Sequence, residues 1–199
     1  DLFVAPAFRI AVAASVCCFT GQMLSFVALP FYLQHDLGLN PMQTGLYMTP
    51  WPIAVAVVAP LSGRLSEHVR TAWLCGAGGA LLALGLIVIV AFPQAGALGF
   101  LIGGVIAGAG FGLFQTPNNR ILLLSAPKAR SGAAGAMQGT ARLSGQTFGS
   151  ILMAVIFGIA PLAAAPRLAI LIAAAFTALA AVVSLTRARY EGGAAGGPE

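Results

Sequence analysis

Amide and guanidinium side chains interrupt two of the most apolar stretches of this sequence. The run QTPNNR at 115–120 lies between GFLIGGVIAGAGFGLF and ILLL, and the segment AMQGTARLSGQTFGS at 136–150 holds Gln138, Arg142 and Gln146. These three residues recur every four positions, so they share one face of a helix. Amides and a guanidinium bind and orient polar groups, so both stretches predict binding rather than bond-breaking chemistry.

Arg142 lies deep in its predicted helix, about ten residues past the start and roughly 15 Å along the axis. That is too deep for the side chain to extend comfortably to water. Two interpretations stay open: an intramembrane arginine that marks a functional site, or one that bonds backbone carbonyls. Asn118 and Asn119 carry a similar pair of alternatives, because Pro117 leaves backbone groups that their amides could bond.

The sequence lacks the residue patterns of catalytic, metal-binding and nucleotide-binding sites. No Asp or Glu lies inside a predicted span, since Asp36 and Glu67 fall at helix ends, and the spans hold no Ser/His dyad or metal-ligand motif. His35 and His68 lie in loops without metal-ligand spacing. The GAGFG segment at 108–112 lacks the preceding strand that a nucleotide-binding loop needs. We expect no enzyme, no metal, no cofactor and no nucleic acid.

The elements that hold these residues are long apolar helices. Of 199 residues, 59% are hydrophobic and 8% charged, with a mean hydropathy of +0.93. Soluble domains carry about 25% charged residues, whereas about 20 apolar residues cross a bilayer as a helix. We predict an all-α integral membrane protein with one domain over 1–190, a disordered cytoplasmic tail at 191–199, and six transmembrane helices at 7–33, 42–61, 72–92, 98–125, 132–159 and 167–185.

Charge placement predicts the orientation. One side of the predicted helices holds Arg167 beside His35 and Asp36, and the other holds seven basic residues: Arg9, Arg64, Arg70, Lys128, Arg130, Arg187 and Arg189. The positive-inside rule then makes both termini cytoplasmic. The chain begins without an initiator Met or a signal pattern, so we expect a fragment of a longer protein. All three cysteines fall within spans and are interpreted as small apolar residues: Cys17, Cys18 and Cys75.

Polarity separates the six helices into two groups. The third and sixth carry almost no polar side chains, whereas the first, second, fourth and fifth each carry several. Polar residues at membrane depth face a bundle interior or an aqueous cavity. We expect the second group to line a cavity and the first to face lipid. On the fourth helix, Gly104, Gly108 and Gly112 form a stripe typical of close helix packing, and Gln115 and Asn119 continue its face.

Two long segments resemble the drug:proton antiporter branch of the major facilitator superfamily, most closely its 14-helix branch. They cover about half of the chain: LPFYLQHDLGLNPMQTGLYMTPWPIAVAVVAPLSGRLSEHV at 29–69 and GAGFGLFQTPNNRILLLSAPKARSGAAGAMQGTARLSGQTFGSILMAVIF at 108–157. The apolar parts count for little. The resemblance rests on P-N-N-R, S-G-A-A-G and A-R-L-S-G-Q-T in register, and on the spaced glycines and prolines of the first segment.

The resemblance implies the C-terminal half of a bacterial inner-membrane transporter, a six-helix bundle built as a 3+3 inverted repeat. Its partners are the lipid bilayer, a small-molecule substrate and a missing N-terminal portion of six or eight helices. It implies export of lipophilic or amphipathic molecules by alternating access, with a proton gradient as energy source. The predicted substrate-cavity residues are Gln22, Phe26, Tyr47, Trp51, Gln115, Asn118, Asn119, Gln138, Arg142 and Gln146.

The loop GRLSEHVR at 63–70 resembles the superfamily's inner-loop motif, Gly-x-Leu-Ala-Asp-Arg-x-Gly-Arg. Gly63 and Leu65 match and Glu67 replaces the aspartate, whereas His68 and Arg70 depart from the pattern. The motif implies a latch in which an acid pairs with the start of the next helix and a nearby arginine. A solvated basic loop is the alternative. The predicted latch and hinge residues are Gly63, Arg64, Glu67, Arg70 and Pro117, the last as a bend in the fourth helix.

Other functions stay open. The chain could be a self-contained six-helix unit that works as a homodimeric half-transporter or a channel, or an inactive truncated remnant. For Arg142 we favour the tuning of a distant carboxylate over the binding of an anionic group, because substrates of the resembled family are neutral or cationic.

Overall fold

Long helices make up the computed structural model, which describes residues 5–92, 96–124 and 130–191. The tail predicted at 191–199 lies outside these residues from position 192 onward. Within these described residues, six spans are long and apolar enough to cross a membrane, and α2 and α3 together form the second of them. This confirms the predicted six-span, all-α membrane fold. The helices are α1 (Pro6–His35), α2 (Pro41–Met48), α3 (Pro50–Leu65), α4 (Thr71–Ala91), α5 (Gly96–Leu124), α6 (Ser131–Ile159), α7 (Ala165–Thr186) and α8 (Ala188–Glu191).

The second span differs from the single helix that the sequence predicts. It starts with a capping box, in which the Asn40 side chain accepts from the Gln43 backbone N–H at 2.9 Å and the Gln43 side chain accepts from the Asn40 backbone N–H at 3.1 Å. The helical hydrogen bonding is then interrupted at Thr49, which keeps helical dihedral angles (φ −59°, ψ −37°), and α3 begins at Pro50. Pro50 and Pro52 supply no backbone N–H to the preceding turn, so the two prolines account for the break.

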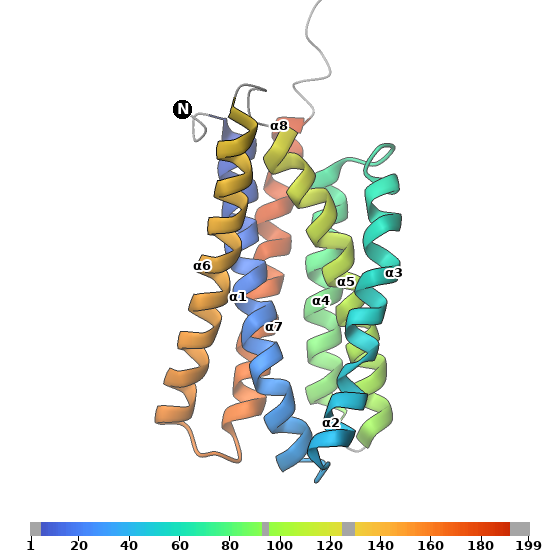
Figure 1. Cartoon of the computed structure of the whole chain (residues 1–199), viewed down its shortest axis with the longest axis vertical. Coiled ribbons are helices and arrows are strands. Elements are labelled where there is room, and N and C mark those ends of the chain that lie inside the picture. Colours follow the sequence, from blue (N-terminus) through green and yellow to red (C-terminus); the bar gives the residue numbers. More distant parts are fainter. Residues whose placement is uncertain (1–4, 93–95, 125–129, 192–199) are drawn as a thin grey trace, which may run out of the picture.

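The helix contacts reveal an inverted repeat. The main packed pairs are α4 with α5, α1 with α7, α1 with α6, α3 with α5, and α4 with α7. Exchanging α1 with α5, α3 with α6, and α4 with α7 maps this set of pairs onto itself. The exchanged helices run in opposite directions, as α1 and α5 do in Figure 1. The fold therefore has the 3+3 inverted repeat that the sequence predicts.

Glycines let α5 approach two neighbours closely. On the α4 side, a Cβ added at Gly85 would lie 2.5 Å from the Gly103 carbonyl oxygen, so the two backbones nearly touch. On the other side, a Cβ at Gly108 would lie 2.5 Å from the Trp51 carbonyl oxygen of α3, and Gly112 faces α3 similarly. Gly104, the third member of the predicted stripe, faces open space. The packing interpretation thus holds for Gly108 and Gly112.

The spans differ in how much of them the bundle covers. The α2–α3 span and α6 are the least buried of the six, and each stands at an edge of the bundle (Figure 1). Large apolar side chains stay exposed along both edges, among them Ile53, Val57, Leu143, Ile151 and Val155. The α4 and α7 helices, which the sequence assigns to lipid, pack against each other with one face and expose the other.

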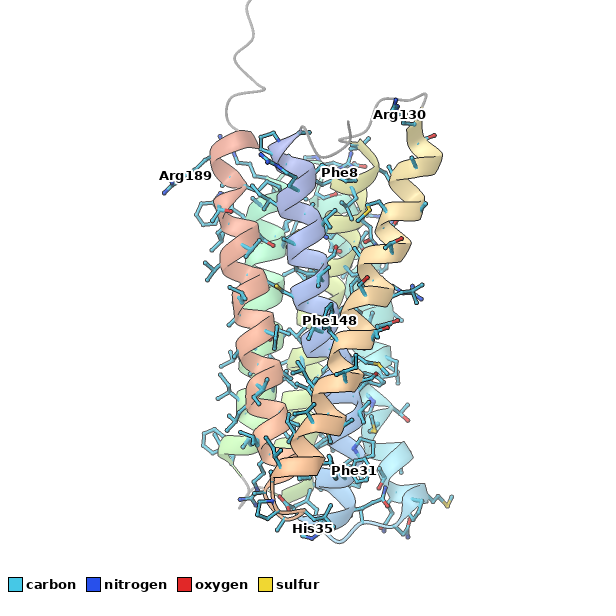
Figure 2. All side chains as sticks on the ribbon, turned by 90° about the vertical axis from the view of Figure 1, so that its left-hand side faces the viewer. Phe8, Phe31, His35, Arg130, Phe148 and Arg189 are labelled. Carbon is cyan, nitrogen blue, oxygen red and sulfur yellow. The ribbon has the colours of Figure 1, made fainter. Side chains whose placement is uncertain are left out.

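Charge divides the two ends of the bundle. One end, called the basic end below, carries the arginines at the helix termini and short connections there: Arg9, Arg64, Arg70, Arg130, Arg187 and Arg189. The opposite end carries Arg167 with His35 and Asp36. Figure 2 shows Arg130 and Arg189 at the first end and His35 at the second. Lys128 lies outside the described residues.

Candidate functional site

An aromatic groove lies where α1, α3 and α5 meet. It has a volume of about 280 Å³ and contains three of the predicted cavity residues, Gln22, Phe26 and Trp51. The complete lining is Gln22, Phe26, Trp51, Pro52, Val55, Ala56 and Phe111. Among the residues that the structure describes, no charged side chain lines the groove, and Gln22 supplies its one amide. The groove can therefore hold an apolar or aromatic group and orient one polar atom of it.

Two ring contacts fix the walls of the groove. Phe26 and Trp51 pack edge to face with their centroids 5.4 Å apart, and Phe19 and Phe111 do the same at 5.7 Å. Trp51 is only 4% exposed, because its backbone lies against the bare Cα of Gly108 on α5. Edge-to-face pairs hold each ring at a defined angle. The groove is accordingly preformed on its Phe26–Trp51 side.

Tyr47 lies next to this groove. Together with Trp51 and Met48 it lines a smaller hollow that reaches Gly104 and Phe100 on α5. Trp51 thus lines both hollows, and the second has no room for a water molecule. Four of the predicted cavity residues, Gln22, Phe26, Tyr47 and Trp51, are gathered by this arrangement.

The predicted residues nearer the basic end do not join the groove. Gln115, Asn119, Gln138 and Gln146 are half-buried on α5 and α6, and none of them lines a hollow with the aromatic residues. Arg142 is exposed, and its guanidinium makes no hydrogen bond within the described part of the chain. Arg142 therefore does not bond backbone carbonyls of the described residues, although one of its two interpretations predicts such bonds.

Asn118 differs from the other predicted cavity residues. It is 1% exposed and points into the bundle. Its Nδ2 donates to the Ser15 hydroxyl at 2.7 Å and to the Ala11 carbonyl at 3.3 Å, both on α1. Its Oδ1 accepts from Nη1 of Arg187 at 3.2 Å. Placing Asn118 in the cavity set needs correction, because its amide is used inside the bundle.

The loop at the basic end differs from the predicted latch. Glu67 is exposed and forms no ion pair with any residue that the structure describes, and Arg64 and Arg70 are exposed as well. The connection is held instead by Arg120 of α5, whose Nη1 donates to the Ser66 carbonyl at 2.9 Å and to its hydroxyl at 3.0 Å. Ser66 is the C-cap of α3, where unpaired carbonyls attract a cation.

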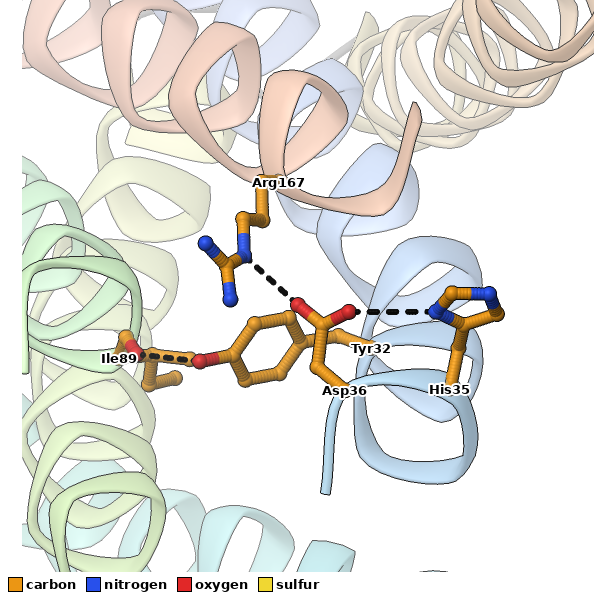
Figure 3. Close-up of polar contacts among 5 residues, drawn as sticks. All are labelled: Tyr32, His35, Asp36, Ile89 and Arg167. Atoms are coloured by element: carbon orange, nitrogen blue, oxygen red, sulfur yellow. Dashed lines mark hydrogen bonds and ion pairs between the residues drawn. The ribbon is translucent and has the colours of Figure 1, made fainter. Parts of the chain in front are cut away.

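The opposite end has a polar cluster of its own (Figure 3). Arg167 Nε donates to Asp36 Oδ2 at 2.7 Å, and His35 Nδ1 lies 3.3 Å from the other carboxylate oxygen. The Arg167 guanidinium lies 5.9 Å from the Tyr32 ring centroid, and the Tyr32 hydroxyl donates to the Ile89 carbonyl at 3.2 Å. These contacts join α1, α4 and α7.

Sequence reasoning missed several participants in these sites. Phe111 and Val55 were hidden among apolar neighbours, and no signal in the sequence separates them from other core residues. Arg187 was assigned to the cytoplasmic side with no direction for its side chain, which is fully buried. Ser15 offered a signal, since it is a hydroxyl at membrane depth in the first predicted helix.

Comparisons with known proteins relate the chain to membrane transporters. A sequence profile of the Major Facilitator Superfamily matches residues 11–197. The uncharacterized transporter YebQ of Escherichia coli K12 is 47% identical over 156 residues, which is 78% of this chain and 34% of that protein.

Two further relatives have names that state a substrate type. The riboflavin transporter RibZ of Clostridioides difficile is 31% identical over 71% of this chain and 31% of its own length. The multidrug efflux pump LfrA of Mycolicibacterium smegmatis is 26% identical over 78% of this chain and 31% of its own length. The chain thus spans about a third of the length of these curated relatives.

Proposed function

Because the chain belongs to the major facilitator superfamily, we propose that it forms the C-terminal half of a transporter that exports small lipophilic or amphipathic molecules by proton antiport. Its six membrane-spanning helices make it part of a multi-pass membrane protein. The single observation that carries the proposal is the uncharged aromatic groove between α1, α3 and α5.

The chemistry of the groove supports this substrate class. Half-buried Phe26 lines the groove with Trp51 and Phe111, which are 4% and 7% exposed, and this apolar wall suits apolar groups of many shapes. The Gln22 amide can donate to or accept from one polar group. A charged substrate would find no counter-ion among these linings. The names of two relatives agree with such a substrate, since one is a multidrug efflux pump and the other transports riboflavin, a planar aromatic molecule.

The exposed edges support alternating access. The α2–α3 span and α6 flank the groove side of the bundle and are the least buried spans. In the proposed arrangement, an N-terminal portion of six or eight helices covers these edges and supplies the other wall of the cavity. Rocking of that portion against this bundle would open the groove to each side of the membrane in turn.

Proton coupling is proposed to use a carboxylate outside this segment. Spans α1 to α7 contain no Asp or Glu between their ends, and membrane proton relays usually run through carboxylates or histidines. Arg142, which is exposed on α6, would then tune such a carboxylate on a facing helix. We propose that the protein lies in a bacterial inner membrane with its basic end on the cytoplasmic side. This orientation is the one that the positive-inside rule favours.

Transport by the full-length protein tests this function. Trp51→Ala and Phe111→Ala should raise the KM for efflux of a lipophilic fluorescent dye, because each removes ring area from the groove. Trp73→Ala is the matched control, since Trp73 is 56% exposed on the outer face of α4. Equal effects of Trp51→Ala and Trp73→Ala would contradict the assignment of the groove. A channel would pass dye without a proton gradient, and an inactive remnant would pass none.

A further inference from the structure

Arg187 turns inward at a position where an arginine would ordinarily reach for water. It follows directly on α7 at the basic end, yet its side chain is fully buried. Long basic side chains near helix ends usually extend to the membrane surface. Burying a guanidinium is costly unless several hydrogen bonds hold it. Its Nη1 donates to Asn118 on α5, and its Nη2 lies 3.4 Å from the Cys75 sulfur on α4.

The hydrogen bonds around Asn118 fix the orientation of its amide. A guanidinium can only donate, so the atom facing Arg187 must be the carbonyl oxygen Oδ1. The Nδ2 group then faces α1, where the Ala11 carbonyl and the Ser15 hydroxyl both accept from it. Asn118 is therefore clamped between α1 and Arg187.

Asn118 lies in a turn of α5 that lacks one backbone hydrogen bond. Pro117 is buried one position earlier and provides no backbone N–H, so the helix loses the bond to the Leu113 carbonyl at this turn. On the next position, Asn119 points about 100° away from Asn118 and stays half-buried on the face that Gln115 shares. Rotation of this turn would therefore move the Asn118 and Asn119 amides together.

We propose that Arg187 and Asn118 are positioning residues that set the rotation of the Gln115–Asn119 turn and so aim its two outward amides at the transport cavity. This role rests on the proposed transport function. Arg120 completes the support from the other side, because it ties the end of the same turn to the C-cap of α3. The turn is thus held from α1, α7 and α3 at once.

Thiol labelling in the full-length protein tests the proposal without requiring transport. Asn119→Cys is labelled with N-ethylmaleimide, and the background is measured on protein without this change, in which buried Cys75 stays in place. Arg187→Gln and Ser15→Ala should each change the labelling rate at position 119 several-fold. Arg187→Lys should stay closer to the native rate, since a lysine retains a donor for Asn118. Arg189→Gln, at an exposed arginine two positions later, should leave the rate unchanged.

An unchanged labelling rate in folded Arg187→Gln and Ser15→Ala proteins would overturn the proposal. Ser15→Ala removes a single hydroxyl, so it carries the test if Arg187→Gln does not fold. Dye efflux supplies the second readout, in which Arg187→Gln should raise KM more than it lowers kcat. A changed labelling rate in a protein that exports no substrate would retain the positioning role and reject the proposed function instead.

Discussion

Arg167 Nε lies 2.7 Å from Asp36 Oδ2, although the two residues are 131 positions apart in sequence. The pair joins the end of α1 to the start of α7 at the opposite end of the bundle. Helix α7 packs beside α1 in the fold, and this ion pair links the two helices at that end. The Tyr32 ring beneath the guanidinium adds an aromatic face to the same contact.

Replacing Asp36 by Asn should destabilise the protein modestly and in a salt-dependent way. The Arg167 side chain is 46% exposed, so water and ions screen the pair, and the expected loss is about 1 kcal/mol or less. The melting temperature of Asp36→Asn should therefore fall in low salt and approach that of the native protein in high salt. A loss that is equal at both salt concentrations would contradict an electrostatic origin.

Adding a methyl group at Gly85 should be much more damaging. Its Cβ would meet the Gly103 oxygen and the Ala107 nitrogen of α5, both at 2.5 Å, and backbone atoms cannot move aside cheaply. We expect Gly85→Ala to cost about 1–3 kcal/mol, the range for overpacking. Gly104→Ala is the control, because nothing lies within 4 Å of its added Cβ. Thermal unfolding in detergent compares the two, and equal melting temperatures would refute close α4–α5 packing.

Removing the guanidinium of Arg120 should loosen the connection after α3. Arg120→Gln loses the charge-assisted bonds to Ser66, and we expect a cost of about 1 kcal/mol because the arginine is partly exposed. Amide hydrogen exchange over residues 66–70 should speed up. Arg64→Gln, at an exposed arginine in the same region, should not change it. Unchanged exchange in Arg120→Gln would mean that Arg120 does not hold this connection.

The helices and their order were predictable because long apolar runs leave few alternatives to membrane-spanning helices. The break at Thr49 was not predicted, although Pro50 and Pro52 supply its physical cause. Three of the seven residues that line the groove were predicted, Gln22, Phe26 and Trp51, and of these Gln22 and Trp51 stand out by polarity and size in apolar helices. Phe111 was not predicted, because which apolar ring faces a groove depends on how two helices rotate against each other.

The asparagine pair shows more clearly what the sequence alone cannot predict. Asn118 and Asn119 are chemically identical and adjacent, and only the rotation of α5 decides which of them points into the bundle. Arg187 shows the same limit, since the positive-inside pattern assigns an arginine to an end of the membrane but not to a direction. Its contacts with Asn118 of α5 and Cys75 of α4 turn this one inward.

Photoaffinity labelling tests the central claim most directly, namely that the groove between α1, α3 and α5 binds the substrate. The full-length protein in membranes is irradiated with a diazirine derivative of an exported lipophilic dye, and modified residues are identified by mass spectrometry. Modification is expected at Phe26, Trp51 and Phe111, and excess unmodified dye should suppress it. Suppressible modification confined to other helices, with none at these three residues, would contradict the claim.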